Sequence, residues 1–236
     1  MIRGAILDID GTILDSMKIW DEAGPRYLAG LGVQAEKGLP EVLAAMSVPE
    51  AAEYMKDRYA LRPSPEEITS GIVQTVHDFY VQEVRLKDGA KEFLESFAER
   101  RIPVIAATTS EEEYLRPAFR RLGIADAFRR IITGSEAGCG KTEPRMYQMA
   151  AEDLGAEPGE LIVAEDALYA LETAARAGFL TAGVYDPSSE ADQERIRALS
   201  DVYLSSLTEL DRFWEFAENA GLAENAGPAA QSRPVR

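Results

Sequence analysis

The chain has 236 residues, of which 46% are hydrophobic and 28% charged, values typical of a globular protein that can bury a full core and carry a smaller second module. Its net charge of -16 argues against nucleic acid and anionic membrane surfaces as partners. The single cysteine, Cys139, excludes an intrachain disulfide, and no stretch approaches the roughly 20 apolar residues of a membrane span. We therefore expect a cytoplasmic protein.

The first predicted element is a short strand over Ala5–Leu7, whose unbroken apolar run is typical of a strand buried on both faces. Asp8 and Asp10 follow it. Side chains two positions apart in an extended chain point the same way, and Gly11 then permits a sharp turn. Two adjacent carboxylates repel each other unless a cation lies between them. The pattern therefore predicts a divalent metal site, and oxygen ligands favour Mg²⁺.

Helical patterns dominate the next part of the chain. Met17, Trp20, Tyr27 and Leu31 recur at helical spacing, and Gly32 follows them as a stop signal. Further helices are expected with Pro49 and Pro65 in their first turns. The apolar stripe of the longer one comprises Ile72, Val73, Val76, Tyr80 and Val84. Residues 15–86 thus read as an all-helical segment inserted after the first strand.

From Leu86 onward, predicted strands and helices alternate. We expect helices around Phe93–Phe97, over Glu111–Leu122, over Pro144–Leu154 and before Gly178, and strands over Ile102–Thr108, Arg130–Thr133, Leu161–Glu165, Leu180–Val184 and Val202–Leu204. Such alternation builds a parallel sheet with helices on both faces. The predicted fold class is therefore α/β, with a Rossmann-like parallel core and an inserted all-helical module.

Polar side chains collect at the carboxyl ends of these predicted strands, where ligands bind in open parallel sheets. Thr108, with Thr109 after it, ends one strand, and Glu165-Asp166 ends another. The strand Arg130–Thr133 leads through a glycine-rich loop to Lys141. Together with Asp8 and Asp10, these residues offer a nucleophile, a proton donor, metal ligands and groups for phosphate oxygens, which suits phosphoryl transfer.

Two other motif readings fit less well. Gly138-Cys139-Gly140-Lys141-Thr142 is similar to a P-loop, but Ser135 stands where the first glycine is needed, and Glu143-Pro144 indicates that the helix begins later. A calcium loop of the EF-hand kind is excluded because Ile13 stands at its glycine position. Asp8 and Asp10 could also simply close the strand as turn residues.

With these motifs in order, the chain resembles the haloacid dehalogenase (HAD) superfamily, in the helical-cap branch that includes beta-phosphoglucomutases and phosphoglycolate phosphatases. Asp8-Ile9-Asp10-Gly11-Thr12 matches the first family motif, Thr108 the second, Lys141 the third and Glu165-Asp166 the fourth. The resemblance spans residues 1 to about 205. It implies a discontinuous catalytic core over 1–14 and 87–218 and a helical cap over 15–86; residues 219–236 are expected to form a flexible tail.

The resemblance also implies a role for each motif residue. Asp8 would be the nucleophile that forms an aspartyl-phosphate, and Asp10 the general acid and base. Mg²⁺ would be held by the Asp8 carboxylate, the Asp10 backbone carbonyl and Asp166. Glu165 is either a further metal ligand, a carboxylate that orients one, or an acid favoured by the N-terminus of a helix. Thr108, the backbone N–H of Thr109 and Lys141 would bind the phosphate.

These roles predict a magnesium-dependent phosphatase of a small phosphorylated metabolite, and two relatives remain as alternatives. A phosphosugar mutase of the beta-phosphoglucomutase type would carry a histidine on the first cap helix, where this chain has Trp20. A phosphonoacetaldehyde hydrolase needs a cap lysine, and Lys18, Lys37 and Lys56 lack a matching context. The third motif departs from the family's usual Lys-Pro, because Thr142 follows Lys141. A binding module without catalysis is the remaining alternative.

Overall fold

The computed structural model describes residues 1–44 and 46–223 of the chain. These residues form two compact units. The first, here called the sheet unit, comprises Met1–Ile13, Lys87–Thr109 and the described residues from Asp126 onward; the second, the helical unit, comprises Leu14–Leu86 and Ser110–Ala125. Among the described helices, none combines the length and apolar character needed to cross a membrane. The predicted domain boundaries at 14/15 and 86/87 stay a prediction.

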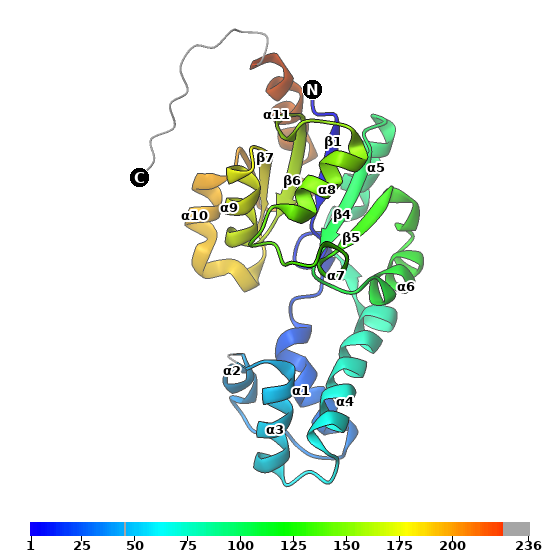
Figure 1. Ribbon diagram of the computed structural model, residues 1–236, viewed down its shortest axis with the longest axis vertical. Helices are drawn as coiled ribbons and strands as arrows, with labels where there is room; N and C mark the ends of the chain where they lie inside the picture. The colour runs from blue at the N-terminus through cyan, green and yellow to red at the C-terminus, as the bar shows by residue number, and fades with distance from the viewer. Residues whose placement is uncertain (45, 224–236) are drawn as a thin grey trace. The chain divides into compact units, whose positions relative to one another are not determined.

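The sheet unit is built on a parallel six-stranded sheet with the strand order β5-β4-β1-β6-β7-β8 (Figure 1). The strands are β1 (Gly4–Leu7), β4 (Val104–Thr108), β5 (Arg130–Thr133), β6 (Leu161–Glu165), β7 (Leu180–Val184) and β8 (Val202–Leu204). Every residue of β1 is buried, as its continuous apolar run predicted. The predicted α/β fold class with a parallel sheet is confirmed.

Helices cover both faces of this sheet. The helices of the sheet unit are α5 (Ala90–Glu99), α7 (Gly134–Ala137), α8 (Arg145–Leu154), α9 (Leu168–Arg176), α10 (Gln193–Leu199) and α11 (Leu210–Ala223), with 3₁₀ turns η2 (Ala125–Ala127), η3 (Pro158–Glu160) and η4 (Pro187–Asp192) nearby. The chain moves outward from β1 through β4 to β5 and then returns to β6 on the other side of β1. Because strand crossovers are right-handed, this reversal moves the connecting helix to the opposite face. The carboxyl end of β1 is therefore the topological switch point, where such sheets bind ligands.

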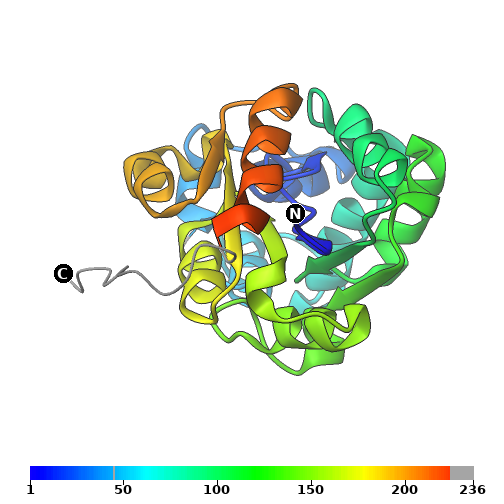
Figure 2. The same cartoon turned by 90° about the horizontal axis from the view of Figure 1, so that it is seen from above.

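Each helix layer has its own apolar core. On one face, α8 and α9 bury Met146, Tyr147 and Ala174 against Ile6 of β1 and Val163 of β6. On the other face, the helices α5 and α11 lie side by side (Figure 2). Their aromatic rings pack edge to face, with ring centroids 4.9 to 5.5 Å apart. These rings belong to Phe93, Phe97, Phe213 and Trp214. The two cores hold the sheet rigidly between them, and the site at its carboxyl edge rests on that support.

The helical unit contains α1 (Ile19–Gly30), α2 (Leu39–Leu43), α3 (Val48–Tyr59), α4 (Pro65–Asp78), the π-helical turn η1 (Phe79–Glu83) and α6 (Glu112–Leu122). Pro49 and Pro65 lie in the first turns of α3 and α4, as predicted. Both helices begin with a capping box: the backbone N–H of Ser47 donates to Glu50 at 2.8 Å, and that of Ser64 donates to Glu67 at 2.7 Å.

The inserted segment is not entirely helical. Two short strands, β2 (Leu14–Asp15) and β3 (Arg85–Leu86), pair antiparallel at its two ends, so that the expectation of an all-helical stretch over 15–86 was wrong at both ends. Two residues on each side are too few to show the alternation that identifies a strand in a sequence. Their pairing depends on two segments far apart along the chain that meet in space.

Three helices of the sheet unit were not predicted from the sequence. The helices α7 and α10 are short, and α7 buries none of its residues, so neither has an apolar stripe of useful length. The helix α11 does carry such a stripe in Phe213, Trp214 and Ala217. It extends to Ala223, so residues 219–223 of the predicted flexible tail are helical, and residues 224–236 lie outside the described residues.

Candidate active site

The carboxyl ends of β1, β4 and β6 lie side by side because β1 pairs with both neighbours in parallel register. The ladder continues one residue beyond β1, since the Asp8 N–H donates to the Ala164 carbonyl at 3.0 Å. This bond places Asp8 beside Glu165, the last residue of β6, and beside Asp166, which follows it. Residues separated along the chain by the whole inserted segment and two further strands are thereby brought together.

Lys141 completes this group from a different loop. The chain leaves β5, forms the single turn of α7 and passes Gly138, whose positive φ of 71° ends that turn, before it reaches Lys141. The Lys141 side chain is only 4% exposed; its ammonium donates to Asp8 Oδ1 and, at 2.6 Å, to Glu165 Oε1. The loop therefore places the buried ammonium group of Lys141 between two buried carboxylates. A P-loop has a different geometry, since its helix follows the lysine directly, whereas α8 begins only at Arg145.

Three buried carboxylates face one another at this site. Asp8, Glu165 and Asp166 each offer an oxygen, and these atoms lie within 4.8 Å of one another. Burial, followed by the charge of Asp8, raises the pKa of Asp166 well above its usual value, and the same causes raise the pKa of Glu165 to about 7. The pKa of Asp8 is raised by burial and by Asp10, although Lys141 acts in the opposite direction. Lys141 alone does not balance three such charges.

A divalent cation fits this group of residues. Among the described residues, no donor reaches the buried oxygen Oδ2 of Asp8, while its other oxygen is held by Lys141. A buried carboxylate oxygen without a donor is unfavourable unless a cation or another ligand contacts it. Oxygen ligands from carboxylates are those that Mg²⁺ and other hard cations prefer. The acidic metal site predicted from Asp8 and Asp166 is therefore supported by a buried cluster that also includes Glu165.

The other predicted site residues lie nearby. Thr108, the last residue of β4, is fully buried, and its hydroxyl donates to Asp10 Oδ2 at 3.4 Å. Asp10 is partly exposed, and its carboxylate is not one of the three that form the cluster. Thr109 follows directly and is exposed. The structure thus joins Thr108 to Asp10, and Lys141 to Asp8 and Glu165.

Three further residues contact the site or the loop beside it, and the sequence patterns had assigned none of them a role there. Thr12, fully buried, donates its hydroxyl to Asp166 Oδ1 at 3.3 Å, and the Tyr147 hydroxyl donates to Glu165 Oε1 at 3.1 Å. Lys87 donates to the Gly11 carbonyl at 2.6 Å and to Asp186 at 2.7 Å. The glycine-turn position of Thr12 and a tyrosine on the buried face of α8 were visible signals, because a buried hydroxyl needs a partner.

The raised pKa of Glu165 predicts an unusual pH dependence of stability. Between its ordinary value of 4.5 and about 7, the folded protein binds a proton that the unfolded chain has released. The contribution of Glu165 to the free energy of unfolding therefore decreases as the pH rises through this interval. Urea unfolding of the EDTA-treated protein from pH 5 to pH 8 measures it. Glu165→Gln should show a shallower decrease than the wild type, because the contribution of Glu165 is removed, and a wild-type slope retained by that variant would contradict the assignment.

Magnesium should change the pH dependence of the free energy of unfolding as well. It binds the deprotonated carboxylates of the folded state, so at 100 times its dissociation constant it adds about 2.7 kcal/mol to the free energy of unfolding. The gain should increase as the pH rises past about 7, where Glu165 loses its proton.

Comparison with known proteins identifies the family of this chain. The model of the haloacid dehalogenase-like hydrolases matches residues 2–178, a stretch that includes every motif residue discussed above. The chain belongs to the haloacid dehalogenase-like hydrolases. The membership predicted from the four motifs is confirmed, and with it the prediction of an enzyme of the phosphoric monoester hydrolase class.

Individual members of this family are similar over almost the whole chain. Validoxylamine A 7'-phosphate phosphatase of Streptomyces hygroscopicus subsp. limoneus is 29% identical over 89% of this chain and 96% of its own length. Hexitol phosphatase B of Escherichia coli K12 is 27% identical over 89% of this chain and 94% of its own. A proposed beta-phosphoglucomutase of Thermotoga maritima superposes with a TM-score of 0.80 at 22% identity, covering 91% of this chain and 99% of its own, which shows the shared fold.

The helical unit has an apolar pocket of about 410 Å³ between α1, α3 and α4. Trp20, 52% exposed, and Asp21 lie in its wall on α1. The remaining residues are almost all apolar: Ala23, Gly24, Leu43, Ala44, Met46, Val48, Ala51, Ile72 and Val76. Trp20 therefore forms part of an apolar surface.

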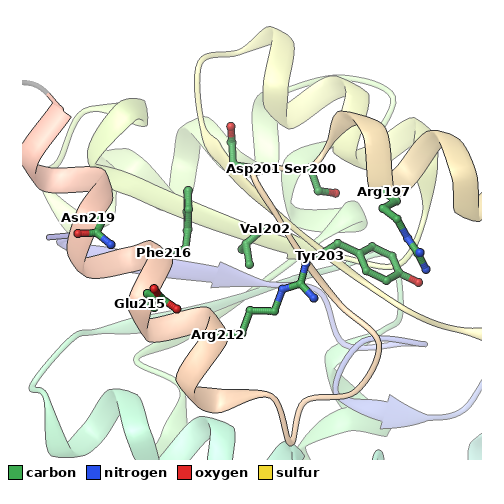
Figure 3. A pocket seen from close by; sticks show the side chains of 9 residues that line it. All are labelled: Arg197, Ser200, Asp201, Val202, Tyr203, Arg212, Glu215, Phe216 and Asn219. Atoms are coloured by element: carbon green, nitrogen blue, oxygen red, sulfur yellow. The ribbon is translucent and has the colours of Figure 1, made fainter.

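A second depression, of about 440 Å³, lies at the β8 edge of the sheet unit between α10 and α11 (Figure 3). Arg197 and Arg212 line it together with Asp201 and Glu215, so both charge signs are present. The guanidinium of Arg197 stacks 4.5 Å above the Tyr203 ring. None of the family motif residues lines this depression, and its mixed charge does not favour an anionic ligand.

Proposed function

We propose that this protein hydrolyses the phosphate monoester of a small metabolite through an aspartyl-phosphate on Asp8, with Mg²⁺ as its cofactor. The observation that carries the proposal is the buried group of Asp8, Glu165, Asp166 and Lys141 at the topological switch point. Asp8 Oδ1 is held by Lys141, while Oδ2 has no donor among the described residues. Asp8 is thus oriented and has an oxygen available for a ligand.

The proposed reaction has two displacement steps on phosphorus. A carboxylate oxygen of Asp8 attacks, the P–O bond to the alcohol breaks, and Asp10 gives the departing oxygen its proton. Asp10 then takes a proton from water, which attacks the phosphorus, breaks its bond to Asp8 and releases inorganic phosphate. Thr108, which donates to Asp10 at 3.4 Å, orients that carboxylate.

The negative charge of the carboxylates and the phosphoryl group would be balanced mainly by Lys141 and by the bound cation. Asp8, Asp166 and Glu165 would hold Mg²⁺, together with the Asp10 carbonyl. When bound, the ion neutralises charge between Asp8 and the phosphoryl oxygens. Lys141 keeps Asp8 ionised, and the backbone N–H of Thr109 would donate to a phosphate oxygen.

The substrate class that the relatives support is a phosphorylated sugar or polyol. Several relatives are named as phosphatases of such compounds, namely of hexitol phosphates, fructose 1-phosphate and phosphorylated carbohydrates. We therefore propose that the substrate is a phosphorylated carbohydrate of about the size of a hexose or hexitol phosphate. Release of inorganic phosphate from a panel of sugar, polyol and non-sugar phosphates in the presence of Mg²⁺ tests the proposal; turnover of the non-sugar esters alone would contradict it.

Features of the helical unit favour hydrolysis over the two alternative activities. Trp20, at the position of the mutase histidine, has no group that exchanges protons near neutral pH. Lys56 donates to the Leu61 and Pro63 carbonyls at 3.3 and 2.5 Å, and Lys18 lies 3.5 Å from Asp15, so both ammonium groups are engaged. Incubation with a hexose 1-phosphate distinguishes a mutase, which would form the 6-phosphate, from a phosphatase, which releases phosphate.

Asp10→Asn tests the proposed division of labour between the two aspartates. Hydrolysis of an alkyl phosphate should fall by about 10² to 10⁴, because the alkoxide leaves without a proton. An aryl phosphate with an acidic phenol needs no such proton, so the first step should survive and give a burst of phenol equal to the enzyme concentration. Rapid-quench measurement with p-nitrophenyl phosphate detects it; equal losses on both substrates without a burst would contradict this role.

A further inference from the structure

The hydroxyl of Tyr147, which belongs to none of the family motifs, contacts the acidic cluster. Tyr147 belongs to α8, and its side chain is 1% exposed. Its hydroxyl donates to Glu165 Oε1 at 3.1 Å, and Lys141 donates to the same oxygen at 2.6 Å. One carboxylate oxygen therefore receives two hydrogen bonds from one stretch of chain, the loop and helix that follow β5.

We propose that Tyr147 is a positioning residue that fixes the Glu165 carboxylate for binding a divalent cation, an inference that rests on the proposed function. A glutamate carboxylate at the end of a strand can rotate about its side-chain bonds. With Oε1 bound by Tyr147 and Lys141, the plane of the Glu165 carboxylate is set. This orientation brings a Glu165 oxygen within 4.8 Å of the oxygens of Asp8 and Asp166.

Packing alone would not require a hydroxyl at this position. The Tyr147 ring lies in an apolar cluster with Ile6, Met146 and Val163, and its centroid is 6.0 Å from that of Phe179. Phenylalanine would fill the same space. Burial and the neighbouring carboxylates raise the pKa of Tyr147, so the hydroxyl keeps its proton and acts as a donor.

Asp166, like Glu165, accepts a hydrogen bond from a hydroxyl group. Thr12, which belongs to the loop after β1, donates to Asp166 Oδ1 at 3.3 Å. The two acids that end β6 are thus each oriented by a hydroxyl from a different loop or helix. Groups that orient metal ligands in this way affect metal affinity strongly, by about 10- to 100-fold when removed.

The test compares Tyr147→Phe with a matched variant, Tyr203→Phe. Tyr203 is also buried, and its hydroxyl donates to Gln193 Oε1 at 2.7 Å. It lies in β8, the edge strand, which β7 separates from β6 and its acidic residues. Both variants lose one buried tyrosine hydrogen bond, so a structural cost is common to them. Calorimetric titration with MgCl₂ at pH 8, with no substrate, measures the metal affinity directly, and far-UV circular dichroism verifies the folding of both proteins.

We expect the Mg²⁺ dissociation constant of Tyr147→Phe to rise about 10-fold or more, and that of Tyr203→Phe to equal the wild-type value. The Mg²⁺ concentration for half-maximal hydrolysis of p-nitrophenyl phosphate should rise in parallel, while the rate at saturating Mg²⁺ largely recovers. A dissociation constant of Tyr147→Phe within twofold of both other proteins would overturn the inference. Wild-type protein without any metal-dependent turnover would instead overturn the proposed function.

A double-mutant cycle shows whether Tyr147 acts through Glu165. If it does, Tyr147→Phe has no further effect on Mg²⁺ affinity in the Glu165→Gln background. Additive losses in the double variant would show that Tyr147 does not act through this carboxylate and would overturn the inference. The cycle also remains informative if Tyr147→Phe lowers thermal stability, because the comparison is made between metal affinities of folded proteins.

Discussion

Asp8→Asn is expected to reduce the hydrolysis of p-nitrophenyl phosphate by at least about 10⁴-fold, since losses of this size follow removal of a catalytic nucleophile. The amide cannot form the acyl phosphate. It also provides a weaker metal ligand at the oxygen Oδ2, which has no donor among the described residues. Asparagine has nearly the same shape as aspartate, so the bond from the residue 8 N–H to the Ala164 carbonyl and the fold should persist.

The control for this variant is Asp126→Asn, which makes the same chemical change at an exposed turn position. It should retain wild-type activity. Steady-state rates across Mg²⁺ concentrations, together with circular dichroism, make the comparison. Turnover by Asp8→Asn within tenfold of the wild type, with the protein folded and free of deamidated material by mass spectrometry, would rule out Asp8 as the nucleophile.

Lys141→Met is expected to lower the free energy of unfolding of the metal-free protein at pH 8 by about 3–5 kcal/mol, the usual cost of removing one partner of a buried ion pair. Asp8, Glu165 and Asp166 would then share one buried space without their only ammonium partner in the described site. Activity should fall as well, because Lys141 orients Asp8. Urea unfolding monitored by tryptophan fluorescence measures the change.

The expected destabilisation has a characteristic pH dependence. It should decrease toward pH 5, where the carboxylates of the variant become protonated, and Mg²⁺ should restore part of the lost stability at pH 8. Lys91→Met serves as the control, because Lys91 is 54% exposed and 4.0 Å from Glu95, and it should change stability by less than about 0.5 kcal/mol. An equal effect of the two substitutions would show that the Lys141 ion pairs contribute little.

The sequence predicted most of the sheet unit because its strands and helices have strong local signals. Arg130–Thr133, Leu161–Glu165 and Leu180–Val184 are strands with the predicted bounds, since apolar runs between turn residues define them locally. The helix end at Gly155, and that at Gly123 in the helical unit, also agree, because both glycines adopt positive φ. Elements without such local signals, the strands β2 and β3 and the helix α7, were missed.

The site was predictable at the level of residue types but not of individual contacts. The sequence indicated that Asp8, Asp10, Thr108, Lys141, Glu165 and Asp166 collect at one sheet edge, because carboxyl ends of parallel strands share an edge. It left three roles open for Glu165. The structure shows that Glu165 faces Asp8 and Asp166 and accepts from Lys141 and Tyr147. These contacts depend on strand order and helix packing, which a single sequence does not reveal.

By itself, the sequence determined which chemical groups are available at the candidate active site: two aspartates after a buried strand, a hydroxyl, a lysine and a second pair of acids. These choices are local, because a strand end and the residue that follows it are encoded next to each other. Only the tertiary structure decided which of these groups meet. Pairing of β1 with β6 brings Asp8 beside Glu165 and Asp166, whereas Asp10 receives the hydroxyl of Thr108. Side chains from distant segments approach within a few ångströms only after the sheet has formed and its helices have packed.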